Sequence, residues 1–371
     1  MDIKEAASAD VGSPIASWFA NAFTARITII DLMLFSRYMH SLMKSGVPIM
    51  RALAGLQEST VNRAFAAVIA DLRIALDSGR TLSTAMRQHP LVFSRFYVSM
   101  VRVGETTGTL HETFSRLFSY LEFEKELRDR INSALRYPLI VLLVVAIAVG
   151  VVNFAVIPAF ARIFKTAGVA LPLVTRVLVG TSDVTQNYWH VIVFAVVCLV
   201  AGARAVVRSE AGGYAWDRYK LRLPLTGSII LRATLARFAR SLALSLRAGV
   251  PIVQALTVVA DVVDNAFIAQ RIERMRDGVE RGESVLRTAV TAGVFTPTIL
   301  QMIAVGEESG EFENLLTEIA EFYEREIDYE VKSLSAQIEP IMTAVMGALV
   351  AVLALGVFLP LWDLGSVALR K

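Results

Sequence analysis

Two short motifs in this 371-residue chain have residue types that could do chemistry. Gly104-Glu105-Thr-Thr-Gly108 and Gly306-Glu307-Glu-Ser-Gly310 each place a carboxylate beside the first of two glycines four residues apart. This spacing could suit a phosphate-binding loop, but no Gly-Lys-Ser/Thr follows, no strand is expected before it, and an acidic residue repels phosphate. Two hypotheses remain. The carboxylates accept backbone N–H bonds at the positively polarised start of the long helix that follows, or the turns are exposed contacts for a partner.

A second pair of motifs predicts tight corners between helices. Ser45-Gly46-Val47-Pro48 returns later as Ala248-Gly249-Val250-Pro251. Each glycine can take the left-handed conformation that ends a helix, and each proline suits the first position of the next one. We expect these corners to be structural, with direct contact to a partner as the alternative.

The residues needed for enzyme chemistry do not form a recognisable constellation. The four histidines lie in unrelated contexts, and no Gly-x-Ser-x-Gly turn, dinucleotide-binding glycine turn or His-Glu-x-x-His occurs. Cys198 is the single cysteine, which excludes an internal disulfide or a cysteine-based metal cluster. The sequence therefore predicts no catalytic residue, no cofactor and no metal.

The motifs recur because the chain is duplicated. Phe35–Leu53 returns as Phe238–Leu256 at an offset of 203 residues, and Met100–Gly108 returns as Met302–Gly310 at an offset of 202. Repeats of this length are whole domains rather than solenoid units. Apolar residues recur at helical spacing without alternating segments of useful length, so we expect only helices.

Composition points to a chain that is partly in a membrane. It is 55% hydrophobic with a mean hydropathy of +0.54, yet 19% of its residues are charged. Three apolar runs, Leu139–Ile157, Tyr188–Val207 and Ile341–Trp362, are long enough to cross a bilayer, which takes about 20 mostly apolar residues in a helix. The middle run is the weakest, but both copies can lie on one side of the membrane only if it also crosses.

Basic residues predict the orientation of these spans. Pro158–Asn187, between the first two runs, carries three basic residues, whereas the opposite flanks are richer in Lys and Arg. Both copies should then be cytoplasmic, and the C-terminus should lie outside despite Arg370 and Lys371. The net charge of +3 gives no indication of nucleic-acid binding, and Asp2–Arg26 lacks the pattern of a signal peptide.

These observations divide the chain into nine expected parts. They are an N-terminal segment 1–30, a cytoplasmic helical domain 31–136, a span 138–158, an exterior connector 159–187, a span 188–207, a linker 208–231, a second cytoplasmic helical domain 232–339, a span 340–362 and an exterior tail 363–371.

The chain resembles the type II secretion system F family over about Ile30–Val367. The resemblance is carried by Phe35-x-Arg37 with Ser-Gly-Val-Pro-Ile, by the Gly-Glu-x-x-Gly turns at Gly104 and Gly306, by Pro158-x-Phe160-x-x-Ile163-Phe164 with Leu171-Pro172 and Thr175, and by Leu223-Pro224-Leu225-x-Gly227. It implies an all-α integral membrane protein with two homologous six-helix cytoplasmic bundle domains and three transmembrane helices.

The resemblance also implies a function and a location. Such proteins are multi-pass platforms of the bacterial inner membrane that couple a cytoplasmic hexameric ATPase to the extraction of pilin or pseudopilin and to filament assembly. Expected partners are that ATPase, the pilin or pseudopilin, other inner-membrane assembly proteins, the lipid bilayer and further copies of the chain. The N-terminus would be cytoplasmic and the C-terminus periplasmic.

About 30 residues precede the first copy, fewer than is usual in the secretion and type IVa pilus branches. This favours a type IVb or conjugative-type pilus system. Two functions of other classes compete with the platform: a subunit of a small-solute transporter and a membrane-tethered enzyme. Span interiors without charged residues disfavour transport, and the missing constellation disfavours an enzyme.

Overall fold

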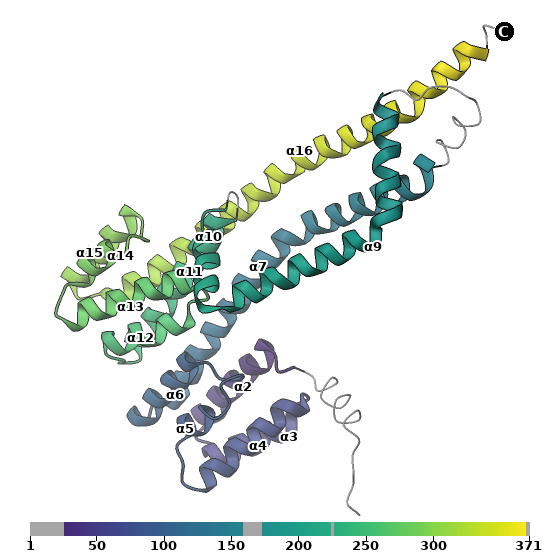
Figure 1. The fold of residues 1–371 in the computed structure, drawn as a ribbon. Coiled ribbons are helices and arrows are strands. Elements are labelled where there is room, and N and C mark those ends of the chain that lie inside the picture. The colour runs from purple at the N-terminus through teal and green to yellow at the C-terminus, as the bar shows by residue number, and fades with distance from the viewer. Residues whose placement is uncertain (1–25, 159–172, 224–225, 369–371) are drawn as a thin grey trace, which may run out of the picture. The chain divides into compact units, whose positions relative to one another are not determined.

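The computed structural model describes residues 26–158, 173–223 and 226–368, and helices are the only regular elements among them (Figure 1). The all-helical prediction is confirmed. Most of the expected N-terminal segment, residues 159–172 of the expected connector, the motif residues 224–225 and the last three residues of the expected tail lie outside the described residues.

Six helices of the first copy have counterparts in the second. α3, α4 and α5 begin 203 residues before α12, α13 and α14, and α6 and α7 begin 202 residues before α15 and α16, which matches the two sequence offsets. The helices are α2 Ile29–Lys44, α3 Ile49–Ser59, α4 Arg63–Asp77, α5 Leu82–Met86, α6 Arg95–Thr107 and α7 Leu110–Val151, followed later by α11 Gly227–Arg247, α12 Ile252–Val262, α13 Ala266–Glu280, α14 Val285–Ala292, α15 Pro297–Ser309 and α16 Phe312–Ala368.

Further helices lie between the two copies along the chain. A π-helical turn, η1 (Val152–Val156), continues α7, and α9 (Leu173–Arg208) and α10 (Glu210–Lys220) follow. α9 is interrupted at Tyr188, whose φ of −117° and ψ of 15° are not helical. Residues 173–187 of the expected connector and much of the expected linker are therefore helical.

The expected boundaries at 136/138 and 339/340 fall inside helices, because α7 and α16 each continue across them. Among the described residues, no single helix meets a combined test of length and hydropathy for crossing a bilayer. The segments Ser182–Val191 and Val193–Arg208 of α9 meet it as a pair bent by 51°.

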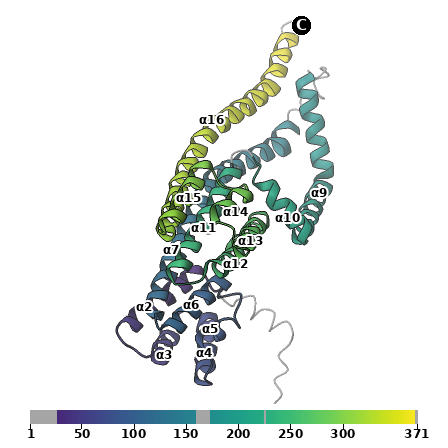
Figure 2. The same cartoon turned by 90° about the vertical axis from the view of Figure 1, so that its left-hand side faces the viewer.

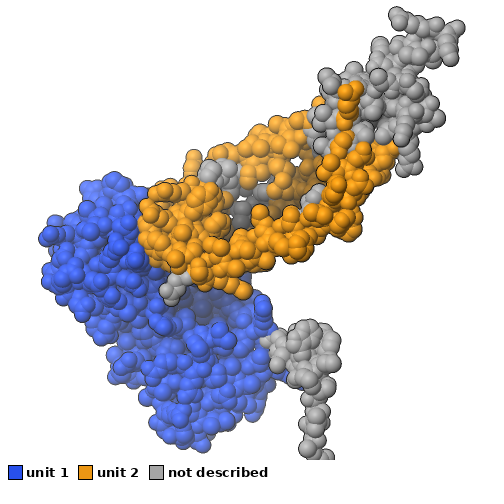
Figure 3. Space-filling view, in the orientation of Figure 1, with its two compact units in different colours: residues 1–126, 237–264, 269–319 blue, residues 127–236, 265–268, 320–371 orange. Residues whose placement is uncertain are grey.

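The contacts divide the chain into two compact units, which Figure 3 colours separately. Unit 1 comprises residues 1–126, 237–264 and 269–319, and unit 2 comprises residues 127–236, 265–268 and 320–371. Unit 1 thus takes residues from both copies of the repeat.

Phe35 on α2 is at the centre of an aromatic cluster in the core of unit 1. Its ring lies 5.7 Å from that of Phe65, 6.1 Å from Phe93 and 6.0 Å from Phe114, and all four are almost fully buried. These residues join α2, α4, the segment before α6, and α7; α3 and α4 lie side by side in both ribbon views (Figure 2). Packing of such rings stabilises the core beyond its buried area.

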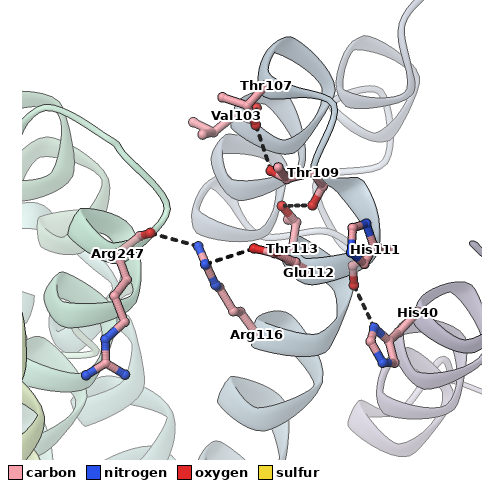
Figure 4. A network of polar contacts seen from close by, with 9 residues as sticks. All are labelled: His40, Val103, Thr107, Thr109, His111, Glu112, Thr113, Arg116 and Arg247. Atoms are coloured by element: carbon pink, nitrogen blue, oxygen red, sulfur yellow. Dashed lines mark hydrogen bonds and ion pairs between the residues drawn. The ribbon is translucent and has the colours of Figure 1, made fainter. Parts of the chain in front are cut away.

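Within unit 1, the two copies are joined by a nearly buried ion pair. Arg237 of α11 donates from Nε and Nη2 to the two carboxylate oxygens of Glu124 on α7, at 2.7 and 2.6 Å. Burial alone would lower the pKa of Arg237, but the hydrogen bonds and charge of Glu124 outweigh it and the pKa is raised. Nearby, Arg116 donates to Glu112 and to the carbonyl of Arg247 (Figure 4).

In unit 2, the π-helical turn Val152–Val156 leaves one carbonyl without its usual partner. In this bonding pattern the acceptor Asn153 would pair with the nitrogen of Pro158, which carries no hydrogen. The hydroxyl of Ser182 donates to the Asn153 carbonyl at 2.6 Å, and Nε2 of Gln186 does so at 3.3 Å. Side chains of α9 thus satisfy a main-chain acceptor beside the π-helical turn.

Candidate functional site

The two hairpin corners have the left-handed glycines that the sequence predicts. Gly46 has a φ of 79° and Gly249 a φ of 86°. The N–H of Gly46 donates to the carbonyl of Met43, and that of Val47 to Leu42, both at 3.0 Å. This pair of hydrogen bonds is typical of a helix that ends in a left-handed residue. The same pair recurs after α11.

The helix after each corner begins one residue after the proline, not at the proline as predicted. Pro48 and Pro251 are the N-cap residues of α3 and α12, not the first helical residues. Their carbonyls accept the first bonds of these helices, from Ala52 at 3.0 Å and Ala255 at 2.9 Å. Because an N-cap needs a carbonyl but no N–H, proline fits there. A partner contact at either corner stays a prediction.

Gly104 and Gly306 lie in helices rather than in turns. Both are buried near the ends of α6 and α15, and only Gly108 and Gly310, with φ of 74° and 75°, end these helices. A Cβ on Gly104 would lie 2.3 Å from Oγ1 of Thr113, so the glycine permits close approach of α7. The expectation of a glycine-bounded turn is wrong because the first glycine serves packing.

Glu105 caps a helix, but not the long one that follows it. Its carboxylate accepts bonds from the backbone N–H groups of Leu82 and Ser83, the latter at 3.1 Å, and from the Ser83 hydroxyl. These groups begin α5, whose N-terminus packs against α6. The capping hypothesis is correct in kind, and its assignment to α7 is wrong.

Glu307 makes the equivalent contact in the second copy. It accepts bonds from the N–H groups of Val285 at 2.8 Å and Leu286 at 3.0 Å, at the start of α14. Glu307 is exposed, whereas Glu105 is half-buried. A carboxylate in this position is stabilised by the positive end of the helix dipole. The contact is a property of the repeat.

Glu105 also borders a cavity of 850 Å³ in unit 1, which we name the α6 groove. One face of α6 lines it, with residues at helical spacing, while the opposite face enters the core. Residues of α5, the residues next to its two ends, the segment before α6 and Val258 of α12 complete the lining. The contributing residues of α6 are Arg95, Val98, Ser99, Arg102, Glu105 and Thr106.

Three arginines make the α6 groove basic. Arg87, Arg95 and Arg102 are exposed, and Arg95 donates to Asp261 at 3.0 Å. Among the described residues, Arg87 and Arg102 have no ion pair or hydrogen bond from their side chains. Guanidinium groups in an open groove can bind carboxylates through paired hydrogen bonds.

The sequence motifs contribute little of this groove. Of the predicted site residues, only Glu105 lines it, and the corner residues do not. The arginines were missed because they follow no known motif. A comparison of the two copies could have pointed to them, because the second copy has no charge at these positions. Arg87, Arg95 and Arg102 correspond to Val290, Pro297 and Ala304 at the two offsets.

The described residues contain no group of three or more His, Cys, Asp or Glu side chains that could hold a metal ion. Cys198 is exposed and is a free thiol. Neither feature gives the α6 groove a role in catalysis. Its arginines suit recognition of an anionic group.

Comparison with known proteins identifies the family. The family model for type II secretion system (T2SS) protein F matches the chain twice, at residues 35–158 and 238–360. The chain belongs to this family. The two matches begin 203 residues apart and end 202 residues apart, as the repeats do. The resemblance seen in the sequence is confirmed.

Relatives in the family cover most of the chain. The type IV pilus assembly protein PilC of Thermus thermophilus is 38% identical over 338 residues, which are 90% of this chain and 82% of that protein. PilC of Pseudomonas aeruginosa is 30% identical over 92% of each chain. The type II secretion system protein F of Pseudomonas aeruginosa is 32% identical over 94% of this chain and 85% of its own.

Proposed function

We propose that this chain is the inner-membrane platform of a type IV pilus or type II secretion machine. The observation that carries the proposal is the double family match, combined with relatives named for pilus assembly and for secretion that cover at least 90% of the chain. The same match gives us no reason to pursue the transporter or enzyme hypotheses. The more specific expectation of a type IVb or conjugative-type system stays a prediction.

The platform would have two cytoplasmic six-helix domains, three spans and a periplasmic C-terminus. Large apolar side chains support the spans, since many are at least half exposed between residues 139 and 154, between 191 and 206 and between 341 and 350. Exposed apolar surface of this extent indicates contact with lipid or protein. The excess of basic residues next to the copies supports a cytoplasmic position for them.

In this role the chain does no chemistry of its own. A cytoplasmic hexameric ATPase would act on the two copies, and pilin or pseudopilin would be moved at the membrane, with further platform copies beside it. α7 and α16 each start in a copy and continue into an apolar run without interruption. A displacement of a copy would thus be carried along a continuous helix.

Three measurements test this proposal. Reporter fusions after Arg136 and Arg232 should behave as cytoplasmic, and a fusion near Gly168 as periplasmic. Deletion of the gene should abolish filaments or secretion, and the ATPase should co-purify with the full chain. Opposite locations for the first two fusions, or normal filaments and secretion without the gene, would overturn the proposal.

A further inference from the structure

We infer that the α6 groove binds an extended acidic segment of a protein partner. The inference rests on the proposed function, because it names the kind of partner that the first copy of the platform would take. It is drawn from the position, spacing and availability of the three arginines, and from their replacement in the second copy.

The spacing of the arginines favours a peptide over a small anion. Arg95 and Arg102 are seven residues apart on one face of α6, two helical turns or about 10 Å. A single phosphate could contact both arginines only if their side chains converged on it, whereas an extended chain can meet each guanidinium group separately. In an extended chain of polyproline II geometry, residues three apart lie on the same side and about 9 Å apart, so acidic side chains at that spacing can meet both arginines.

The arginines are available for such a partner. Arg87 and Arg102 have no ion pair among the described residues. Arg95 pairs with Asp261, but their side chains are 82% and 39% exposed, and an ion pair this exposed is readily exchanged. Ser99 lies between Arg95 and Arg102 on the same helix face and can bond to a peptide backbone.

The acidic groups that face the groove do not cancel its charge. Glu105 directs its carboxylate to the start of α5, where it accepts three hydrogen bonds. Asp261 balances only Arg95. Arg87, Arg95 and Arg102 against Glu105 and Asp261 leave one net positive charge beside a cavity of 850 Å³, which is large enough for several residues.

The second copy shows how the same helix face looks without these charges. On α15, the positions of Arg95 and Arg102 are held by Pro297 and Ala304, and Thr106 is replaced by Glu308. Arg287 replaces Thr84 but lies 3.7 Å from the Glu283 carboxylate. An acidic segment would thus select the first copy.

The test uses the full chain in detergent and a fluorescent octaglutamate peptide as the probe, with octaglutamine for comparison. We expect octaglutamate to bind and octaglutamine not to bind. The variant Arg87→Gln/Arg102→Gln should weaken octaglutamate binding about tenfold or more, since it removes two charge-assisted contacts. Arg51→Gln/Arg63→Gln removes the same charge from exposed positions outside the groove lining and should change binding less than about twofold.

Equal binding by the groove variant and the wild type would overturn the inference. An equal loss in both double variants would do so as well, because it would show only general attraction to a basic surface. Inorganic phosphate or a labelled nucleotide that binds the wild-type groove as tightly as octaglutamate would overturn the choice of a peptide.

Co-purification of the ATPase separates this inference from the proposed function. Retention of the ATPase by a groove variant that still binds octaglutamate would reject the groove and leave the platform intact. Absence of the ATPase from wild-type preparations would count against the platform, and the peptide measurements would still decide on the groove.

Discussion

The two copies have equivalent helices but differ in the ion pairs that hold the long helices α7 and α16. In the first copy, Glu124 on α7 is held by Arg237, which belongs to the second copy. The corresponding Glu326 on α16 is held by Arg232, from its own copy. Equivalent carboxylates on equivalent helices thus have partners of different origin. Both copies have the acid, but Arg237 and Arg232 of the second copy correspond to Leu34 and Ile29 of the first.

The copies also differ in the polarity of their buried residues. Ser36 and Tyr97 form a buried hydrogen bond of 2.8 Å in the first copy, and burial raises the pKa of Tyr97 well above its ordinary value. Their counterparts are Ala239 and Ile299, so both polar partners are replaced together. Such paired replacement avoids leaving a polar group unsatisfied. At this place a polar pair in the core of the first copy is replaced by an apolar pair in the second.

The largest effect should come from Arg237→Leu, which introduces the residue that the first copy has at Leu34. It leaves Glu124 without two hydrogen bonds in a nearly buried position, where both side chains are 12% exposed or less. We expect a loss of about 3 kcal/mol in unfolding free energy. Arg232→Leu should cost about 1 kcal/mol, because that ion pair is more exposed.

Thermal unfolding of the full chain in detergent measures both changes. The double variant Arg237→Leu/Glu124→Leu should regain most of the loss, since no charge is left buried. Equal unfolding midpoints for the two single variants would show that the two ion pairs contribute equally to stability.

The next largest difference should be at the buried glycines. Gly104→Ala places a Cβ 2.3 Å from Oγ1 and 2.9 Å from Cβ of Thr113, and we expect a loss of about 2 kcal/mol. Gly306→Ala meets the end of the Leu315 side chain at 3.0 Å and should cost less, about 1 kcal/mol. Gly55→Ala is the control, because nothing lies within 4 Å and helix propensity should raise the unfolding midpoint.

The corner glycines should respond alike in both copies. A Cβ added at Gly46 or Gly249 meets no atom within 4 Å, so in Gly46→Val and Gly249→Val we expect strain at positive φ to dominate, at about 1.5 kcal/mol each. Asparagine at either position should be milder. A difference of more than about 1 kcal/mol between the two valine variants would mean that one corner has a further role.

The smallest effect is expected at the capping carboxylates. Glu105→Gln turns an amide N–H toward N–H donors at the start of α5 and should cost about 1 kcal/mol. Glu307→Gln should cost about 0.5 kcal/mol, because that side chain is exposed and accepts two bonds rather than three. Glu308→Gln is the matched control with no expected change in unfolding midpoint. A larger loss at Glu307 would reverse the comparison.

Some of this structure follows from sequence because the physics is local. A glycine before a proline predicts the left-handed corner, and the 203-residue repeat shows that Gly46 and Gly249 must behave alike. The switch of offset to 202 before α6 is likewise visible in the chain. Expected boundaries at Pro138 and Pro340 did not become helix ends, because α7 and α16 continue through both positions.

The remainder depends on contacts between distant segments. Glu105 caps α5, whose first residues lie 22 to 23 positions earlier, and no spacing rule shows which helix start a carboxylate will meet. The α6 groove also needs side chains of α5, α6 and α12 together. In the sequence, Arg87 and Arg102 cannot be told from other exposed charged residues. Only the fold places both at one cavity.

The carbonyl of Asn153 has a mechanical consequence. Its hydrogen bonds come from the side chains of Ser182 and Gln186, so they can break and re-form without unwinding either helix. In apolar surroundings an unpaired carbonyl costs several kcal/mol, which makes intermediate separations of the two helices unfavourable. The side chains of Ser182 and Gln186 should therefore hold α9 against the π-helical turn, and their replacement by alanine should weaken this contact.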